Sequence, residues 1–372
     1  MTETPLSAPP EMYFGFDTIS EMGIGWNLGN TLDSIDNRKR GILRELTDIT
    51  PEEYYEIYWG NPVTTAEMIN AVAGAGFGVI RVPVTYADHM DEDFNIRIEW
   101  LERVERVVNY VLDNGIYCII NLHHDTGSGS WPWLKADPEN IVFLENKLSF
   151  VWTQIADFFK HYGDKLIFEG FNEILDTESR WGGASRAAYE AVNRLNQAFV
   201  DAVRAAGGGN ETRRLIVKTY AAGTDKDILD AFVLPDDTQK DLLIAGVHFY
   251  GSMPFTWRQE KISWTKTYSD WNRLRDGKPV EDMLQRIDDR FIKNRVPVII
   301  CEFGAQNKNN TADRVKYAGH YVETAARYGI SCIWWDDGGI FNDAESVNSH
   351  ALLDRNTNRW FFGEIVDAMV LR

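Results

Sequence analysis

LIFEGFNE, residues 166–173, is a short apolar run that closes on an amide and a carboxylate. Seven other segments are also short, largely apolar runs, namely GIGWNLG (23–29), GVIRVPV (78–84), YCIINLHH (117–124), LIVKTYAA (215–222), LIAGVHFY (243–250), PVIICEFGA (297–305) and SCIWWDDG (331–338). Continuous apolar runs of this length are typical of parallel strands that are covered on both faces. The sequence therefore predicts eight parallel strands.

Helical patterns lie between most of these strands. The segment 98–115 places Ile98, Leu101, Val104 and Val108 on one stripe and ends at a glycine. Thr65 precedes a second helix, AEMINAVAGAG, and further helices are expected at 145–160, 186–206, 281–294, 312–328 and 361–371.

Eight strand–helix units predict an α/β fold, a closed (β/α)8 TIM barrel with its active site at the C-terminal ends of the strands. We expect one catalytic domain over residues 16–372 after a loose lead-in at 1–15, with long insertions after strands one, three and six. A doubly wound open sheet is the alternative, but GWNLGN after the first strand lacks the G-x-G-x-x-G order of a phosphate-binding turn.

Composition excludes several classes of partner. The chain has 38 Lys and Arg against 56 Asp and Glu, and its net charge of −18 would repel a nucleic acid backbone. Cys118, Cys301 and Cys332 each lie in an apolar run, which predicts small buried hydrophobic residues and neither a zinc site nor a disulfide. Thirteen tryptophans are more than packing needs, and their flat faces suit sugar rings.

No segment approaches the roughly 20 apolar residues of a membrane helix, so no membrane partner is expected. The N-terminus MTETPLSAPP lacks the basic start and apolar core of a signal peptide. The protein is therefore either cytoplasmic, or a signal peptide has been removed.

The predicted strand ends carry an unusual concentration of polar and aromatic side chains, namely Arg81, His123, His124, Asn172, Glu173, His248, Tyr250, Glu302, Trp335 and Asp336. Glu173 and Glu302 end strands four and seven, so they face each other across the barrel mouth. Retaining glycosidases hold such a pair about 5 to 5.5 Å apart. Each glutamate alone is more often a solvated loop carboxylate, and their conjunction indicates catalysis.

Neighbouring residues assign the two roles. We expect Arg81 and Tyr250 to donate hydrogen bonds to Glu302 and to keep it ionised as the nucleophile. The charge of Glu302 and partial burial should raise the pKa of Glu173, the general acid, which becomes a base once Glu302 is glycosylated. Asn172 is placed to bond the sugar 2-hydroxyl, and Trp335 should form the floor of the reacting subsite.

A catalytic metal is not expected. His123 and His124 are adjacent, so within a strand they should point to opposite sides. Metal-dependent hydrolases on this fold gather more histidines and carboxylates than that. The sequence therefore predicts neither a metal nor a cofactor.

At these residues the chain resembles glycoside hydrolase family 5, the cellulase family of clan A. The similar motifs are GIGWNLGNTLD (23–33), WGNPVTT (59–65), RVPVTY (81–86), NLHHD (121–125), FEGFNE (168–173), HFY (248–250), CEFG (301–304) and WWDDG (334–338). The family's eight recurrent active-site positions would be Arg81, His123, Asn172, Glu173, His248, Tyr250, Glu302 and Trp335.

The doubled histidine, WGNPVTT and the WWD ending look most like subfamily 4, which includes endoglucanases, xyloglucanases, lichenases and enzymes that also accept xylan. The resemblance implies a secreted, monomeric, retaining endo-β-1,4-glucanase acting on cellulose, mixed-linkage glucan or xyloglucan. A β-mannanase or xylanase of the same clan remains an alternative, because loop shape decides specificity. A non-catalytic carbohydrate-binding barrel is the alternative from another class, although such barrels normally lose one glutamate.

Residues in the loops beyond the reacting subsite are expected to line an open cleft. The candidates are Trp59, Trp131, Trp133, Trp181, Trp257 and Trp264, together with Asn30 and His124. Ordinary loop packing is the competing interpretation for each tryptophan, and we expect about half of them to touch substrate. Trp131 and Trp133 could instead fold back on the barrel.

Overall fold

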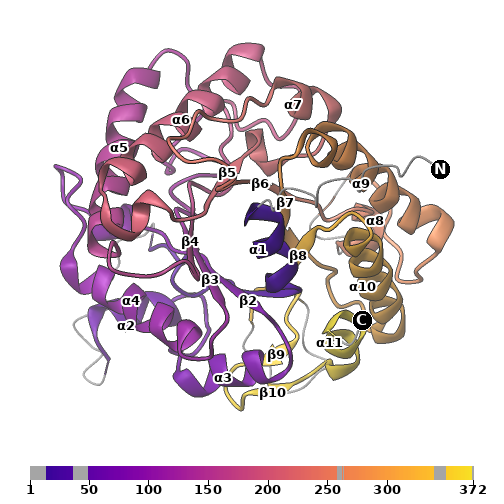
Figure 1. The fold of residues 1–372 in the computed structure, drawn as a ribbon. Coiled ribbons are helices and arrows are strands. Elements are labelled where there is room, and N and C mark those ends of the chain that lie inside the picture. The colour runs from indigo at the N-terminus through magenta and orange to yellow at the C-terminus, as the bar shows by residue number, and fades with distance from the viewer. Residues whose placement is uncertain (1–13, 37–48, 258–261, 263, 339–348, 371–372) are drawn as a thin grey trace, which may run out of the picture.

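A computed structural model of the protein describes residues 14–36, 49–257, 262, 264–338 and 349–370 (Figure 1). Eight parallel strands form a closed barrel in chain order, with β8 paired to β1. The strands are β1 (Gly25–Leu28), β2 (Val79–Val82), β3 (Tyr117–Asn121), β4 (Leu166–Glu169), β5 (Leu215–Lys218), β6 (Leu243–His248), β7 (Val298–Phe303) and β8 (Ser331–Asp336). The predicted (β/α)8 barrel is confirmed.

Helices surround the barrel (Figure 1). Those around it are α2 (Pro51–Ile57), α3 (Ala66–Gly74), α4 (Ile98–Leu112), α5 (Ile141–Phe158), α6 (Arg186–Ala205), α7 (Lys226–Ala231), α8 (Met253–Thr256), α9 (Lys278–Arg290), α10 (Thr311–Ala326) and α11 (Gly363–Val370), whereas α1 (Phe14–Met22) lies over its centre (Figure 1). A two-stranded sheet of β9 (Leu353–Asp354) and β10 (Arg359–Trp360) follows β8. The apolar stripe predicted for α4 is buried at Leu101, Val104 and Val108, but its first residue, Ile98, is exposed. No helix in the described part of the chain has the length and apolar content needed to cross a bilayer.

Side chains that point into the barrel fill it. This inner cluster consists of Ile19, Met22, Val79, Tyr117, Ile119, Ile167, Ile216, Ile244, Ile299, Cys301 and Ile333. Each strand from β2 to β8 contributes to it, and the alternate strand residues pack outward against the helices, as the two-residue period requires. The interior is therefore a packed core, and substrate can bind only at its rim.

Helix α1 was not predicted. Its residues Ile19 and Met22 join the inner cluster, and the helix lies over the centre of the ring in Figure 1. The expected lead-in at 1–15 overlaps it by two residues, and residues 1–13 lie outside the described part. All three cysteines are buried and free, as predicted.

Several strands end earlier than predicted. The run 166–173 is a strand only as far as Glu169, although Phe171 remains buried beyond the ladder. Apolar side chains beyond the strand ends continue the hydrophobic pattern, so the sequence alone cannot locate the last backbone hydrogen bond between neighbouring strands. A Cβ atom at Gly170 would lie 2.7 Å from the Phe199 ring, so glycine lets the chain pass α6 and carry Glu173 to the rim.

Candidate active site

The two predicted glutamates meet at the barrel mouth. Glu173 follows β4, and Glu302 lies in β7. One carboxylate oxygen of each and one ring nitrogen of His248 all lie within 4.8 Å of one another. Carboxyl groups with oxygens this close suit direct attack by one carboxylate while the other protonates the leaving oxygen, as in a retaining pair.

Glu302 is held by two donors. Arg81 Nη1 donates to Oε1 at 2.8 Å, and the Tyr250 hydroxyl donates to Oε2 at 2.8 Å. Both hydrogen bonds are those expected from the sequence. Burial raises the pKa of Glu302, whereas Arg81, Lys218 and the Tyr250 hydroxyl favour its anion. Glu302 is thus oriented by bonds that strengthen when it is ionised.

Arg81 lies beneath the catalytic pair and connects Glu302 to Glu169, Asn172 and Asn27 by hydrogen bonds. Its Nε and Nη2 donate to Glu169 at 2.6 and 2.9 Å, and Nη2 also donates to Asn172 Oδ1 at 2.9 Å. Nη1 reaches both Asn27 Oδ1, at 2.9 Å, and Glu302. All five donors of the guanidinium are used, so its plane cannot turn. Asn172 is left with its amide N–H groups for other partners, which suits the predicted bond to a sugar hydroxyl.

Glu173 has the opposite environment. His248 Nδ1 lies 2.8 Å from its Oε1, and its backbone N–H donates to the hydroxyl of Thr126. Burial and the charge of Glu302 raise the pKa of Glu173 to about 8. The predicted direction of this shift is confirmed, with burial as the larger cause. Glu173 therefore carries a proton under neutral conditions, as a general acid must.

The charges of the buried groups around the catalytic pair explain why Glu173 and Glu302 carry one proton between them. This buried cluster contains two cations, Arg81 and Lys218, and three carboxyl groups, Glu169, Glu173 and Glu302. Burial alone would raise the pKa of Glu169, but Arg81 and Lys218 outweigh it and lower the pKa to about 2. A low-dielectric site favours neutrality, so only one of the other two carboxyls is ionised, and the donors around Glu302 select it.

Glu169, Lys218 and Asn27 were not identified from the sequence as residues of the site. Each is a polar residue inside an otherwise apolar strand, LIFE, LIVK and GWNL, and each is fully buried. A charged residue that is completely buried is almost always paired. That signal could have identified the layer beneath the catalytic pair.

The expectation that His123 and His124 point to opposite sides of a strand was wrong. Because β3 ends at Asn121, neither histidine lies in the strand, and both point toward Asp33. Their Nε2 atoms lie 3.9 and 3.6 Å from Asp33 Oδ2, which has no hydrogen-bond partner among the described residues. His123 also stacks on Trp335, with ring centroids 5.5 Å apart.

Asp33, His123 and His124 could in principle hold a metal ion. The Asn121 side chain argues against it, because its Oδ1 accepts from the Val84 N–H and its Nδ2 must then donate to His123 Nδ1. The neutral ring consequently carries its proton on Nε2, the atom that faces Asp33. The arrangement offers a hydrogen-bond donor to a sugar and not a lone pair to a metal.

The predicted cleft tryptophans outside the reacting subsite divide into three groups: those that contact site residues, one that folds back on the barrel, and two that are exposed. Trp59 and Trp131 flank His124, at ring distances of 5.2 and 6.0 Å, and Trp257 packs on Tyr250 at 5.5 Å. Trp133 folds back, donating its N–H to Asp125 at 2.6 Å.

Trp181 and Trp264 are exposed, and no ring contact within the described ranges connects either of them to the catalytic pair. Trp335 is half-buried beside Gly29, where a Cβ atom would lie 2.7 Å from its ring. Asn30 is half-buried at the end of β1 in a left-handed conformation, with φ of 59°. Sugar binding by these residues stays a prediction.

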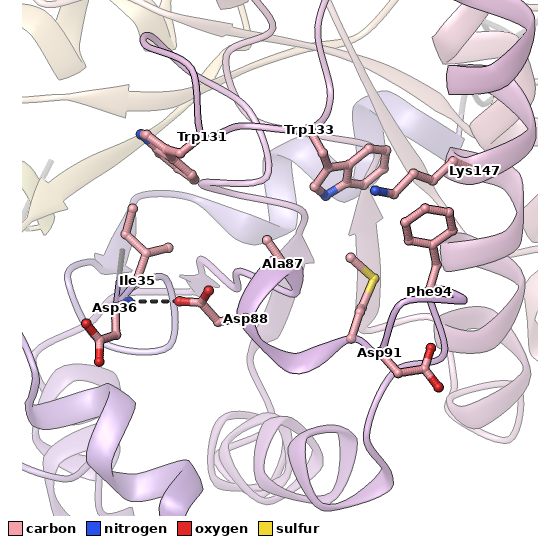
Figure 2. A pocket seen from close by; sticks show the side chains of 10 residues that line it. Ile35, Asp36, Ala87, Asp88, Asp91, Phe94, Trp131, Trp133 and Lys147 are labelled. Atoms are coloured by element: carbon pink, nitrogen blue, oxygen red, sulfur yellow. Dashed lines mark hydrogen bonds between the residues drawn. The ribbon is translucent and has the colours of Figure 1, made fainter. Parts of the chain in front are cut away.

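A pocket of about 340 Å³ lies beside Trp131, which in turn lies near His124 (Figure 2). Its lining consists of Ile35, Asp36, Ala87, Asp88, Met90, Asp91, Phe94, Trp131, Trp133 and Lys147. The Lys147 ammonium lies 3.7 Å from the centroid of the Phe94 ring and 4.2 Å from that of Trp133. Aromatic walls together with carboxylates are the features of a site for a small polar ring.

Comparison with known proteins agrees with this geometry. The family described as Cellulase (glycosyl hydrolase family 5) matches residues 45–339. Endoglucanase A of Ruminococcus albus is 38% identical over 360 residues, which cover 95% of this chain and 91% of that protein.

Two solved structures are similar over nearly their whole length. A xyloglucan-specific endo-β-1,4-glucanase from a metagenomic library, in complex with cellotriose, has a TM-score of 0.84 at 36% identity, covering 96% of this chain and 98% of that one. A lichenase from Caldicellulosiruptor sp. F32, in complex with cellotetraose, has a TM-score of 0.86 at 34% identity, covering 100% and 98%.

Proposed function

The chain belongs to glycoside hydrolase family 5 and is an endo-β-1,4-glucanase of plant cell-wall glucans, and we propose that it works by double displacement with Glu302 as nucleophile and Glu173 as acid/base. The approach of the two carboxyl groups to within 4.8 Å carries the proposal. Their contrasting surroundings assign the roles, because Glu302 receives two hydrogen bonds and Glu173 has its pKa raised to about 8.

In the first step a carboxylate oxygen of Glu302 attacks the anomeric carbon, and the bond from that carbon to the bridging oxygen breaks. The proton of Glu173 moves to the departing oxygen. Glu302 is then a neutral ester, so the cluster loses one negative charge and Glu173 can ionise without leaving it unbalanced. In the second step Glu173 takes a proton from water, the water oxygen attacks the same carbon, and the ester bond breaks.

Two inversions at one carbon give net retention, which is the first expected result. Cleavage of a soluble glucan followed by proton NMR should show the β-anomer as the product formed first, before mutarotation. Initial appearance of the α-anomer would contradict the proposed roles of both glutamates.

We further propose that the pocket beside Trp131 accepts a branch sugar, so that xyloglucan is a substrate alongside linear glucans. Trp131 lines the pocket and lies beside His124, and neither glutamate is among the lining residues. A linear chain would not need a lateral pocket with aromatic walls, whereas a xylosyl branch would bury one ring in it.

Filling this pocket tests the specificity. Ala87→Phe should lower kcat/KM for xyloglucan by at least about tenfold, because even one methylene in a pocket is worth about 1 to 3 kcal/mol of discrimination, and should change the value for carboxymethylcellulose much less. Ala87→Ser is the matched control, since it adds a single atom. Assays on lichenan, xylan and mannan would show whether the wild-type enzyme also hydrolyses mixed-linkage glucan and the backbones expected of a xylanase or a β-mannanase. An equal loss on branched and linear glucans would reject the branch site.

We also propose that the enzyme acts outside the cell, because its polymeric substrates cannot cross a membrane, and that it acts as a monomer, because one chain supplies every group of the catalytic cluster. Activity confined to the cell fraction of its source, or a dimer mass in light scattering, would contradict the respective part of this proposal.

A further inference from the structure

Lys218 is a buried cation that the mechanism above uses only for charge. It is the last residue of β5 and is fully buried. Its Nζ lies 2.8 Å from His248 Nε2 and 3.0 Å from Glu169 Oε1. An ammonium group has donors and no acceptor, so in this contact His248 Nε2 must be the acceptor.

This contact decides where the proton of His248 resides. Burial and the nearby charges of Lys218 and Arg81 hold the pKa of His248 well below its usual range, so the ring is neutral and carries one proton. With Nε2 accepting from Lys218, that proton lies on Nδ1. Nδ1 is 2.8 Å from Glu173 Oε1, so it donates to that oxygen.

The orientation of Glu173 follows. An oxygen that accepts a hydrogen bond from His248 is the carbonyl oxygen of the protonated carboxyl group, and the acidic proton must then be on the other oxygen. In the other tautomer of His248, Nδ1 would be a lone pair, and the acidic proton of Glu173 would point to it. A proton held by His248 is not available to the leaving oxygen of the substrate.

We propose that Lys218 is a positioning residue that keeps the proton of His248 on Nδ1 and thereby directs the catalytic proton of Glu173 toward the substrate. The inference rests on Glu173 acting as the general acid. Lys218 itself lies beneath His248 and touches no reacting atom.

The charge of Lys218 has a separate effect that a merely structural residue would not have. The charged or titratable groups around Glu173 are Arg81 on β2, Glu169 on β4, Lys218 on β5, His248 on β6, Tyr250 after β6 and Glu302 on β7. Lys218 lowers the pKa of both Glu173 and Glu302. Its removal should therefore move both limbs of the profile of kcat/KM against pH to higher pH.

The test is Lys218→Met assayed on aryl β-cellobiosides whose leaving groups range from strongly to weakly acidic phenols. Weakly acidic phenols need protonation to leave, so their kcat/KM should fall by about 10- to 100-fold, within the range of general acid catalysis. Strongly acidic phenols leave unaided and should show little loss. The parameter kcat/KM is chosen because it does not include hydrolysis of the glycosyl-enzyme.

A second pair of variants allows for the possibility that an unbalanced buried charge prevents folding. Glu169→Gln retains Lys218 and its contact with His248, so it is the control for the proton position on His248, whose Nε2 should remain unprotonated. The double variant Glu169→Gln with Lys218→Met removes one charge of each sign, so the cluster stays neutral. The double variant should show the same steep dependence on the leaving group as Lys218→Met.

The nitrogen NMR spectrum of His248 is a readout independent of turnover. In the wild type and in Glu169→Gln its Nε2 signal should be that of an unprotonated nitrogen, and in the Lys218 variants the population with protonated Nε2 should rise. An equal loss of kcat/KM for all leaving groups, or an unchanged tautomer, would overturn the inference. If Glu173 were not the general acid, the result would be different, because Glu173→Gln would then have the same kcat/KM as the wild type.

Discussion

Replacement of Glu302 by glycine is expected to lower kcat/KM on a soluble glucan by at least about 10⁴-fold, the scale on which removal of a nucleophile acts. The variant should still fold. Without Glu302 the cluster keeps Arg81, Lys218 and Glu169, and Glu173 can ionise to restore neutrality, so no buried charge is left unbalanced. The thermal unfolding midpoint should therefore change little.

A chemical rescue experiment separates loss of the nucleophile from general damage. Azide can enter the space left by the Glu302 side chain, where Arg81 and Tyr250 attract an anion. With an activated aryl β-cellobioside it should attack from that face and give the α-glycosyl azide. Glu178→Gly, a change at an exposed carboxylate, is the control and should leave turnover unchanged. Appreciable hydrolysis by Glu302→Gly without azide would remove Glu302 from its role.

Glu173→Gln has the second largest expected effect, and it depends on the substrate. The amide oxygen can still accept from His248, so the side chain should stay in place. It has no proton to give, so kcat/KM on polymeric glucan should fall by about 10² to 10⁴-fold. On an aryl cellobioside with a strongly acidic phenol kcat/KM should largely survive, while kcat falls because no base activates water.

The glycosyl-enzyme should then accumulate, and mass spectrometry should detect it as an adduct on Glu302. The pH dependence supplies a second criterion. Because the pKa of Glu173 is raised to about 8, wild-type kcat/KM should fall as pH rises through that value and the acid loses its proton. Glu173→Gln should lack this alkaline limb. Its persistence in the variant would assign the limb, and the acid, to another group.

The sequence predicted the site residues at strand ends more reliably than their surroundings. Arg81, Tyr250 and Glu302 make the bonds expected of them, because a barrel brings all its C-terminal strand ends to one rim. The expectation failed for His123 and His124, because it assumed a strand up to residue 124, whereas β3 ends three residues earlier, at Asn121. Side-chain direction inverts with a change of one residue in a strand, so an error in a strand end changes which residues meet.

Loop residues were the least predictable. Trp131 and Trp133 are separated by one residue, yet the first lies beside His124 and the second donates to Asp125 behind it. Loops lack a repeating hydrogen-bond pattern, so nothing local in the sequence fixes where such side chains point. Helix α1 was missed for a similar reason, because the core it covers is formed by strands distant in the chain.

By itself, the sequence determined that the protein is a (β/α)8 barrel with Glu173 and Glu302 at the mouth, because strand periodicity and the polar residue that closes each strand are local properties. Only the tertiary structure showed that Glu169, Lys218 and Asn27 form a buried layer beneath them. Hydrogen bonds and charges act over a few ångströms in space, and these residues come from strands far apart in the chain. The two glutamates could be identified from their own segments, but the difference in their proton affinity arises from neighbours that the fold assembles.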